Sequence, residues 1–297
     1  MDEAQREERI MSIQRDDDRG RKRNRRVVLY VVVAIAVAGG LATAAWMVRS
    51  HALMGWARSH GFQDIHATDR VGRTLAHIAA EEGRIDLLTW LQSQGLDVTT
   101  VKCNAKWTPM VYAANNGQIH VMEWLKSQGA DMTREGLSAP MLRATVGGQL
   151  DTMKWLRMHG AGVEDPSGGF TPMYCAAMIG RVDIMEWLKQ QGADIHVTNV
   201  NGQTPMFWAA EMNHIAAMAW LKDQGADINA KDRYGQTPMF AAAQVTFTHR
   251  SGGVDAMWWL QGQGADINAR DNTGRTPLSV AGNADAKKWL LDNGAQE

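Results

Sequence analysis

The stretch TNVNGQTPMFWAA at residues 198–210, followed by MAWLKDQGADIN at residues 218–229, decides the fold. Asn201-Gly202 favours a tight turn, and the Thr-Pro pair that follows can cap a helix and begin it, because the first helical residue needs no free N–H. The second segment has apolar residues at three- and four-residue spacing and ends at a glycine, which predicts another short helix. Each helix has about ten residues and is too short to stand alone in water. The stretch therefore predicts a helix-turn-helix unit that is stabilised by neighbouring units.

The tryptophans show that this unit recurs along the chain. Seven tryptophans are each followed by leucine, at intervals of 30 to 39 residues: Trp90, Trp124, Trp155, Trp187, Trp220, Trp259 and Trp289. Trp56 lies 34 residues before the first of them, and six of these eight tryptophans have a methionine two positions earlier. Such a period is typical of repeat proteins, whose units stack on their neighbours. We expect these eight tryptophans to lie in the core.

The repeated unit resembles a known family. The pattern Gly-x-Thr-Pro-hydrophobic-x-x-Ala-Ala, followed by hydrophobic-Leu-x-x-x-Gly-Ala-Asp-Ile-Asn, is similar to the ankyrin repeat of about 33 residues. It covers roughly residues 66–297, and residues 49–65 are expected to form a degenerate half-repeat or N-terminal cap. The resemblance implies an all-α ankyrin-repeat solenoid of about seven repeats, with stacked helix-turn-helix units and β-turn or hairpin connections.

The sequence departs from the family pattern at several positions. The family's histidine after Thr-Pro-Leu is present only as His77, so we expect its usual hydrogen bond between loops to be missing elsewhere. The third unit is short and has Ala139-Pro140 in place of Thr-Pro. The sixth unit has about six extra residues within 244–253, and the last is truncated after Ala281.

Residues 27–48, VVLYVVVAIAVAGGLATAAWMV, contain no charged residue. At about 1.5 Å per residue a helix of this length spans about 33 Å, enough for a hydrocarbon core of about 30 Å. Six of the eight residues 19–26 are basic, so the positive-inside rule puts the N-terminus in the cytoplasm and the repeats on the other side. We therefore predict one transmembrane helix at 27–48, after a disordered charged tail at 1–26. A bacterial inner membrane with periplasmic repeats is the expected location.

Two alternatives to this anchor stay open. Ala42-Thr43-Ala44 has the small-x-small form of a signal-peptide cleavage site, and cleavage after Ala44 would release a soluble exported protein. The apolar segment could also be a buried helix of a soluble protein, although an ankyrin stack does not require one. A run of 22 residues is longer than the roughly 7–15 residues of a signal core, which favours the anchor.

Composition and motifs exclude several classes of function. With 31 basic and 32 acidic residues, the chain is unlike a nucleic-acid-binding protein. Its two cysteines, Cys103 and Cys175, lie two repeats apart, so we expect free thiols rather than a disulfide. The sequence has no phosphate-binding loop, nucleophile elbow or metalloprotease motif, so we expect no catalysis, metal ion or cofactor. An enzymatic site around His249, Arg250 and Asp255 is the alternative, but no nucleophile–base pair supports it.

A protein-binding surface is the remaining class of site. Ankyrin repeats bind partner proteins on a concave face formed by the hairpin tips and the far ends of the first helices, and the resemblance implies the same here. Large apolar side chains at such positions are typical of interfaces. Carrying the face over by position selects these residues as partner-binding: Trp107, Asn115, Asn116, Phe170, Met178, Ile179, Met212 and Tyr234.

Overall fold

The computed structural model describes residues 52–166, 169–244 and 253–296, which belong to two compact units, Met1–Ile65 and His66–Glu297. In the first unit, residues 52–59 form a helix in which Leu53 and Ala57 are buried. The predicted charged tail and transmembrane segment lie outside the described residues.

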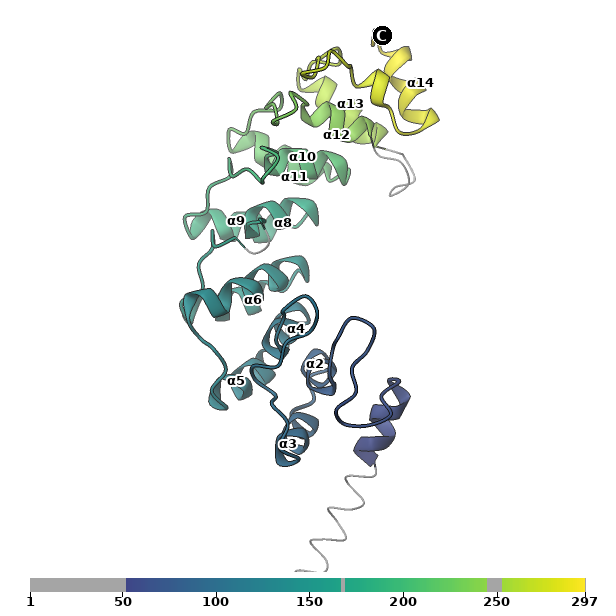
Figure 1. Ribbon diagram of the computed structural model, residues 1–297. Coiled ribbons are helices and arrows are strands. Elements are labelled where there is room, and N and C mark those ends of the chain that lie inside the picture. Colours follow the sequence, from purple (N-terminus) through teal and green to yellow (C-terminus); the bar gives the residue numbers. More distant parts are fainter. Residues whose placement is uncertain (1–51, 167–168, 245–252, 297) are drawn as a thin grey trace, which may run out of the picture. The chain divides into compact units, whose positions relative to one another are not determined.

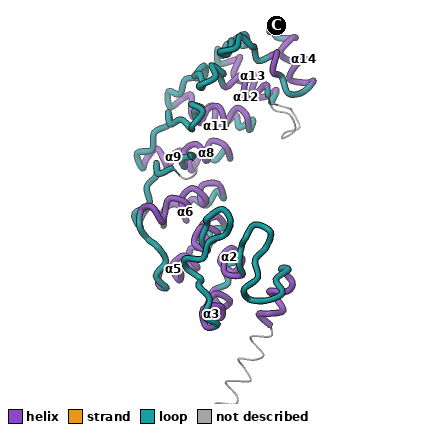
Figure 2. The backbone as a smooth tube through the Cα atoms, in the orientation of Figure 1, coloured by secondary structure: helices purple, strands orange, loops and turns teal. Residues whose placement is uncertain are grey.

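The second unit is a row of helix pairs, in which each first helix packs against the first helix of the next pair (Figure 1). The first helices are α2 (Leu75–Glu81), α4 (Pro109–Asn115), α6 (Arg134–Val146), α8 (Pro172–Met178), α10 (Pro205–Glu211), α12 (Pro238–Ala243) and the short 3-10 helix η1 (Leu278–Val280). The second helices are α3 (Ile85–Ser93), α5 (Ile119–Ser127), α7 (Leu150–Met158), α9 (Val182–Gln190), α11 (Ile215–Asp223), α13 (Val254–Gly262) and α14 (Ala284–Asp292). The described residues contain helices and loops but no β-strand (Figure 2). The predicted all-α repeat solenoid is confirmed.

The local sequence explains where these helices begin and end. Helices α4, α8, α10 and α12 each start at a proline that follows a threonine in extended backbone conformation. Proline fits there because the first turn of a helix leaves its N–H groups without partners inside the helix. Second helices stop before a glycine such as Gly225, whose φ of 93° is in the left-handed region that glycine adopts most easily.

The core prediction for the repeated tryptophans is only partly right. Trp90 and Trp155 are buried, with 8% and 6% of their surface exposed, but the other six are half-buried. Helix geometry gives the reason. In α11, Met218 and Leu221 are three residues apart, share one face and are fully buried. Trp220 is turned by about 100° from Leu221 and lies at the edge of that face.

Hairpin turns connect consecutive pairs. In the turn before α10, the Asn199 N–H donates to the Gln203 carbonyl at 3.1 Å, and the Asn199 side-chain oxygen accepts from two backbone N–H groups of the same turn. Adjacent hairpins are also joined, because the Arg233 N–H donates to the Asn201 carbonyl at 2.9 Å. The hairpins thus form a hydrogen-bonded row beside the first helices.

The third repeat interrupts this row. Its first helix, α6, begins at Arg134 and has 13 residues, so Pro140 lies inside the helix rather than at its first position. The hydroxyl of Thr133 accepts from the Gly136 N–H and caps the early start. The sequence departure at Ala139-Pro140 therefore marks a helix that has been extended in place of a hairpin.

Candidate protein-binding site

The eight predicted partner-binding residues fall into separate groups along the row of first helices. Trp107 and Asn115 share one cavity of about 220 Å³. Its lining, which we call the Trp107 pocket, comes from the first three repeats and consists of Arg73, Glu81, Trp107, Val111, Tyr112, Asn115 and Arg143. Asn116 follows at the end of α4, where it is exposed and its side-chain amide donates to the Tyr112 carbonyl.

Aromatic and guanidinium groups stack in the Trp107 pocket. The guanidinium of Arg143 lies 4.7 Å from the centre of the Trp107 ring, and its Nη2 donates to the Asn115 side-chain oxygen at 2.9 Å. The Trp107 and Tyr112 rings meet edge to face with their centres 6.0 Å apart. The guanidinium of Arg73 lies over the Tyr112 ring, 5.8 Å from its centre. These contacts hold four large side chains in fixed positions.

Arg73 differs from Arg143 in having acidic partners. Its Nε donates a hydrogen bond to a carboxylate oxygen of Asp69 at 2.7 Å, and its Nη1 donates to a carboxylate oxygen of Glu81 at 3.0 Å. Burial, followed by a contact of 3.5 Å with the Cys103 sulfur, raises the pKa of Tyr112 far above its usual range. Tyr112 therefore stays neutral at any ordinary pH.

His77 fixes the backbone of the Trp107 hairpin. Its Nε2 lies 3.0 Å from the Trp107 carbonyl oxygen, and its Nδ1 lies 3.0 Å from the Thr74 backbone nitrogen. Burial lowers the pKa of His77, so the neutral ring is favoured, with Nδ1 accepting and Nε2 donating. The hydrogen bond between loops is present in the repeat that keeps the histidine.

The same bond is missing in repeats that have phenylalanine at this position. Phe207 and Phe240 replace the histidine in α10 and α12. The hydroxyls of Thr204 and Thr237, which would face a histidine, are buried without a hydrogen-bond partner among the described residues. This outcome agrees with the expectation from the sequence.

Phe170 belongs to a second group, in the fourth and fifth repeats. The Phe170 and Tyr174 ring centres are 5.2 Å apart, and Tyr174 and Trp208 follow at 5.3 Å. The Asn199 amide donates to the Tyr174 hydroxyl at 2.7 Å. We call Phe170, Tyr174 and Trp208 the aromatic ladder. It places a predicted interface residue next to two rings that the prediction omitted.

The remaining predicted residues join neither group through a ring contact among the described residues. Met178 and Ile179 are half-buried at the end of α8, and Met212 is half-buried at the end of α10. Tyr234 is 57% exposed at a hairpin tip, where its backbone N–H donates to Asp232 and its carbonyl accepts from Asn272. The structure thus brings Trp107 together with Asn115, and leaves Tyr234 apart from them.

Three residues of these groups share a position that the prediction did not use. Tyr112, Arg143 and Trp208 each lie four residues after the threonine, or its substitute Ala139, that opens the repeat motif. Aligning the repeats by that threonine would have selected them.

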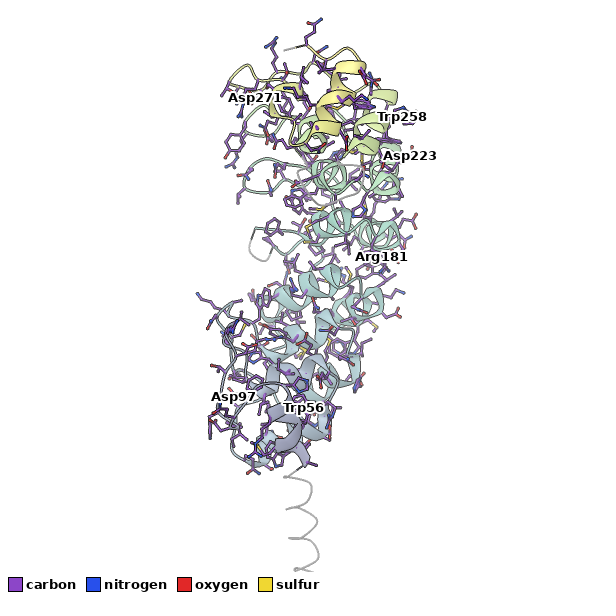
Figure 3. The ribbon with its side chains drawn as sticks, turned by 90° about the vertical axis from the view of Figure 1, so that its right-hand side faces the viewer. Trp56, Asp97, Arg181, Asp223, Trp258 and Asp271 are labelled. Carbon is purple, nitrogen blue, oxygen red and sulfur yellow. The ribbon has the colours of Figure 1, made fainter. Side chains whose placement is uncertain are left out.

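Trp258 is 67% exposed, but it lies elsewhere. Figure 3 shows it on the side of the second helices, opposite the hairpin side marked by Asp271. It is therefore no part of the predicted face.

The cysteines have the properties expected of structural residues. Cys103 and Cys175 are buried free thiols, as predicted. Burial raises the pKa of Cys175 to about 12, so its thiol is protonated and a poor nucleophile. His249 and Arg250 of the alternative enzymatic site lie outside the described residues.

No helix in the described parts of the chain is long and apolar enough to cross a membrane. The predicted span at residues 27–48 precedes those parts and stays a prediction.

Comparison with known proteins agrees with the repeat pattern. A family model described as ankyrin repeats (3 copies) matches residues 34–136, 141–232 and 176–271. Of the solved structures, 528 chains match; the crystal structure of the human ASB11 ankyrin repeat domain does so with a TM-score of 0.59 and 22% identity, covering 76% of this chain and 100% of that chain. The search of curated proteins found no match. Ankyrin repeats are typical of non-enzymatic scaffolds for protein–protein interaction. Since the family matches extend over more than half of the sequence, this chain belongs to the ankyrin-repeat family.

Proposed function

We propose that the chain is a membrane-anchored, non-catalytic ankyrin-repeat protein that binds another protein with the concave face of its repeats, on the non-cytoplasmic side. The Trp107 pocket is the observation that carries the binding proposal. Tryptophan, tyrosine and arginine contribute most to the energy of protein interfaces. In this pocket they are already held by stacking and by a hydrogen bond to Asn115, so these side chains would lose little conformational entropy when a partner binds.

The aromatic ladder supports a binding surface that continues beyond the pocket. Helices α4, α6, α8 and α10 pack in sequence, so the pocket and the ladder lie along one row of first helices. A partner segment that follows this row would meet Trp107 first and Phe170 afterwards.

The proposed anchor rests on the 22 uncharged residues at 27–48 and on the basic run before them. Two other functions of this segment have their own support. Ala42-Thr43-Ala44 fits a cleavage site, which would make the repeats a soluble exported binding protein. The first family match begins at residue 34, which would place residues 34–48 in a further repeat.

The binding proposal is tested with two matched tryptophan variants. Full-length protein carrying Trp107→Ala, Trp258→Ala or neither is immobilised, and proteins retained from an extract of the exported fraction are quantified by mass spectrometry. We expect a protein that the wild type and Trp258→Ala retain and Trp107→Ala loses, with similar thermal unfolding of all three. Equal retention by the two variants would move the site away from the pocket.

The anchor is tested by fusing alkaline phosphatase to the C-terminus and separating membranes from the soluble exported fraction. Activity in carbonate-washed membranes supports the anchor with repeats outside the cytoplasm. Activity in the soluble exported fraction, with a mature N-terminus after Ala44, favours the cleaved form. An inactive fusion would contradict export and favour a further repeat at residues 34–48.

A further inference from the structure

Arg143 differs from the paired arginines of the repeat unit in its charge environment, and from Arg70, Arg157 and Arg233, which also lack an ion pair among the described residues but are exposed, in being half-buried. Five arginines of the repeat unit have a carboxylate oxygen within 3.0 Å: Arg73, Arg84, Arg134, Arg181 and Arg275. Arg143 has no acidic partner among the described residues. The only hydrogen bond of its guanidinium within that part of the chain goes from Nη2 to the Asn115 side-chain oxygen. Half-buried charges are normally paired, so this guanidinium lacks the partner that its position demands.

The contacts of Arg143 also fix the orientation of its guanidinium. Trp107 covers one face of the guanidinium at 4.7 Å, and Asn115 holds one corner. Neither Nε nor Nη1 has a hydrogen-bond partner among the described residues. A guanidinium held in this way presents a planar set of donors that matches the geometry of a carboxylate.

The charges and size of the Trp107 pocket narrow the choice of ligand. Within the lining, Arg73 and Glu81 cancel, which leaves the positive charge of Arg143; Asp69, which pairs with Arg73 from outside the lining, brings the sum of the four charges to zero. Glu81 in the lining disfavours a doubly charged phosphate. A cavity of about 220 Å³ is smaller than the roughly 300–1,000 Å³ of sites for drug-sized ligands, and it suits one side chain.

We propose that the Trp107 pocket accepts an aspartate or glutamate side chain of the partner protein, whose carboxylate pairs with Arg143 while its methylene groups pack on Trp107 and Tyr112. This inference rests on the proposed binding function and adds the chemistry of the partner. The half-buried aromatic rings shield one side of such an ion pair from water, which makes it stronger than a fully exposed one.

The test uses peptides, because the partner is unidentified. A phage-displayed library of random dodecapeptides is selected on the full-length protein, and clones are kept if Trp107→Ala abolishes binding and Trp258→Ala does not. Each peptide is then synthesised with both termini blocked, so that only side chains supply carboxylates. Dissociation constants are measured for the acidic peptide and for the matched asparagine or glutamine peptide, against the wild type and Arg143→Gln.

We expect one acidic position whose amide substitution weakens binding to the wild type at least tenfold and binding to Arg143→Gln less than twofold. Arg143→Lys, which keeps the charge but not the planar fork, should give an intermediate loss. An amide effect below twofold in the wild type, or an equal effect in Arg143→Gln, would overturn the carboxylate proposal while leaving the binding face intact. Binding only to peptides with a free C-terminus would overturn the side-chain assignment. Failure to select any Trp107-dependent peptide would contradict both the carboxylate and the binding proposal.

Discussion

Replacing Thr237 with valine should stabilise the repeat unit. Thr237 is only 2% exposed, its side chain makes no cap hydrogen bond to α12, and its hydroxyl has no partner among the described residues. Leaving a buried hydroxyl unpaired costs about 1–3 kcal/mol, and valine has nearly the same shape without the polar atom. Because the hydroxyl makes no hydrogen bond that would be lost, we expect Thr237→Val to raise the free energy of unfolding by about 1 kcal/mol.

Thr74 provides the matched control, since its hydroxyl lies 3.0 Å from His77 Nδ1. Thr74→Val should lower the free energy of unfolding by about 1 kcal/mol, because it removes a hydrogen bond that is present. Urea denaturation of both variants and the wild type, followed by circular dichroism, gives the two midpoints. A loss of stability in Thr237→Val would refute the reasoning, because it would show that this hydroxyl has a partner in solution.

Three further predictions concern His77, Cys175 and the core. Burial lowers the pKa of His77 below its ordinary 6.5, so the stabilising contribution of this histidine is complete above pH 6.5 and is lost as the pH falls through the lower folded-state pKa. The difference in urea midpoint between wild type and His77→Gln should therefore shrink from pH 7.5 to pH 5. A constant difference would contradict this. With the pKa of Cys175 raised to about 12, only about one thiol in 10,000 is ionised at pH 8, so peptide mapping should find it unalkylated by iodoacetamide in native protein and alkylated in urea. Leu125→Ala, at a fully buried position of α5, should cost about 2–5 kcal/mol by urea denaturation, whereas a change below 1 kcal/mol would place this leucine outside the core.

The third repeat shows why a repeat pattern predicts most of a fold but not every turn. The Thr-Pro pairs predicted helix starts correctly at α4, α8, α10 and α12. At Ala139-Pro140 the same alignment failed, because the preceding residues can form a helix that Thr133 caps earlier. Proline is tolerated inside that helix at some cost, and only the packing of α6 between α4 and α8 decides that the longer helix forms.

The tryptophans show a related difference between the spacing of a residue along the sequence and the burial of its side chain. Their spacing identifies the repeats, because each marks the same turn of a second helix. The degree of burial depends on what packs beside each ring, so Trp90 and Trp155 are buried while the other six remain half-buried. Helix geometry places each tryptophan about 100° from the leucine that follows it, and only the packing of neighbouring elements decides how far that edge of the helix is covered.

The sequence by itself determined the repeated unit, most of its helix starts and ends, the family, and the row on which Trp107 and Phe170 lie. These follow from short-range effects, since capping, turn formation and helical spacing act within one unit. Only the tertiary structure decided that Arg143, 36 residues after Trp107, covers its ring, that His77 holds the Trp107 backbone, and that no carboxylate of the described residues forms an ion pair with Arg143. Stacking brings residues of three repeats into one cavity, and which side chains meet there depends on how adjacent helices pack.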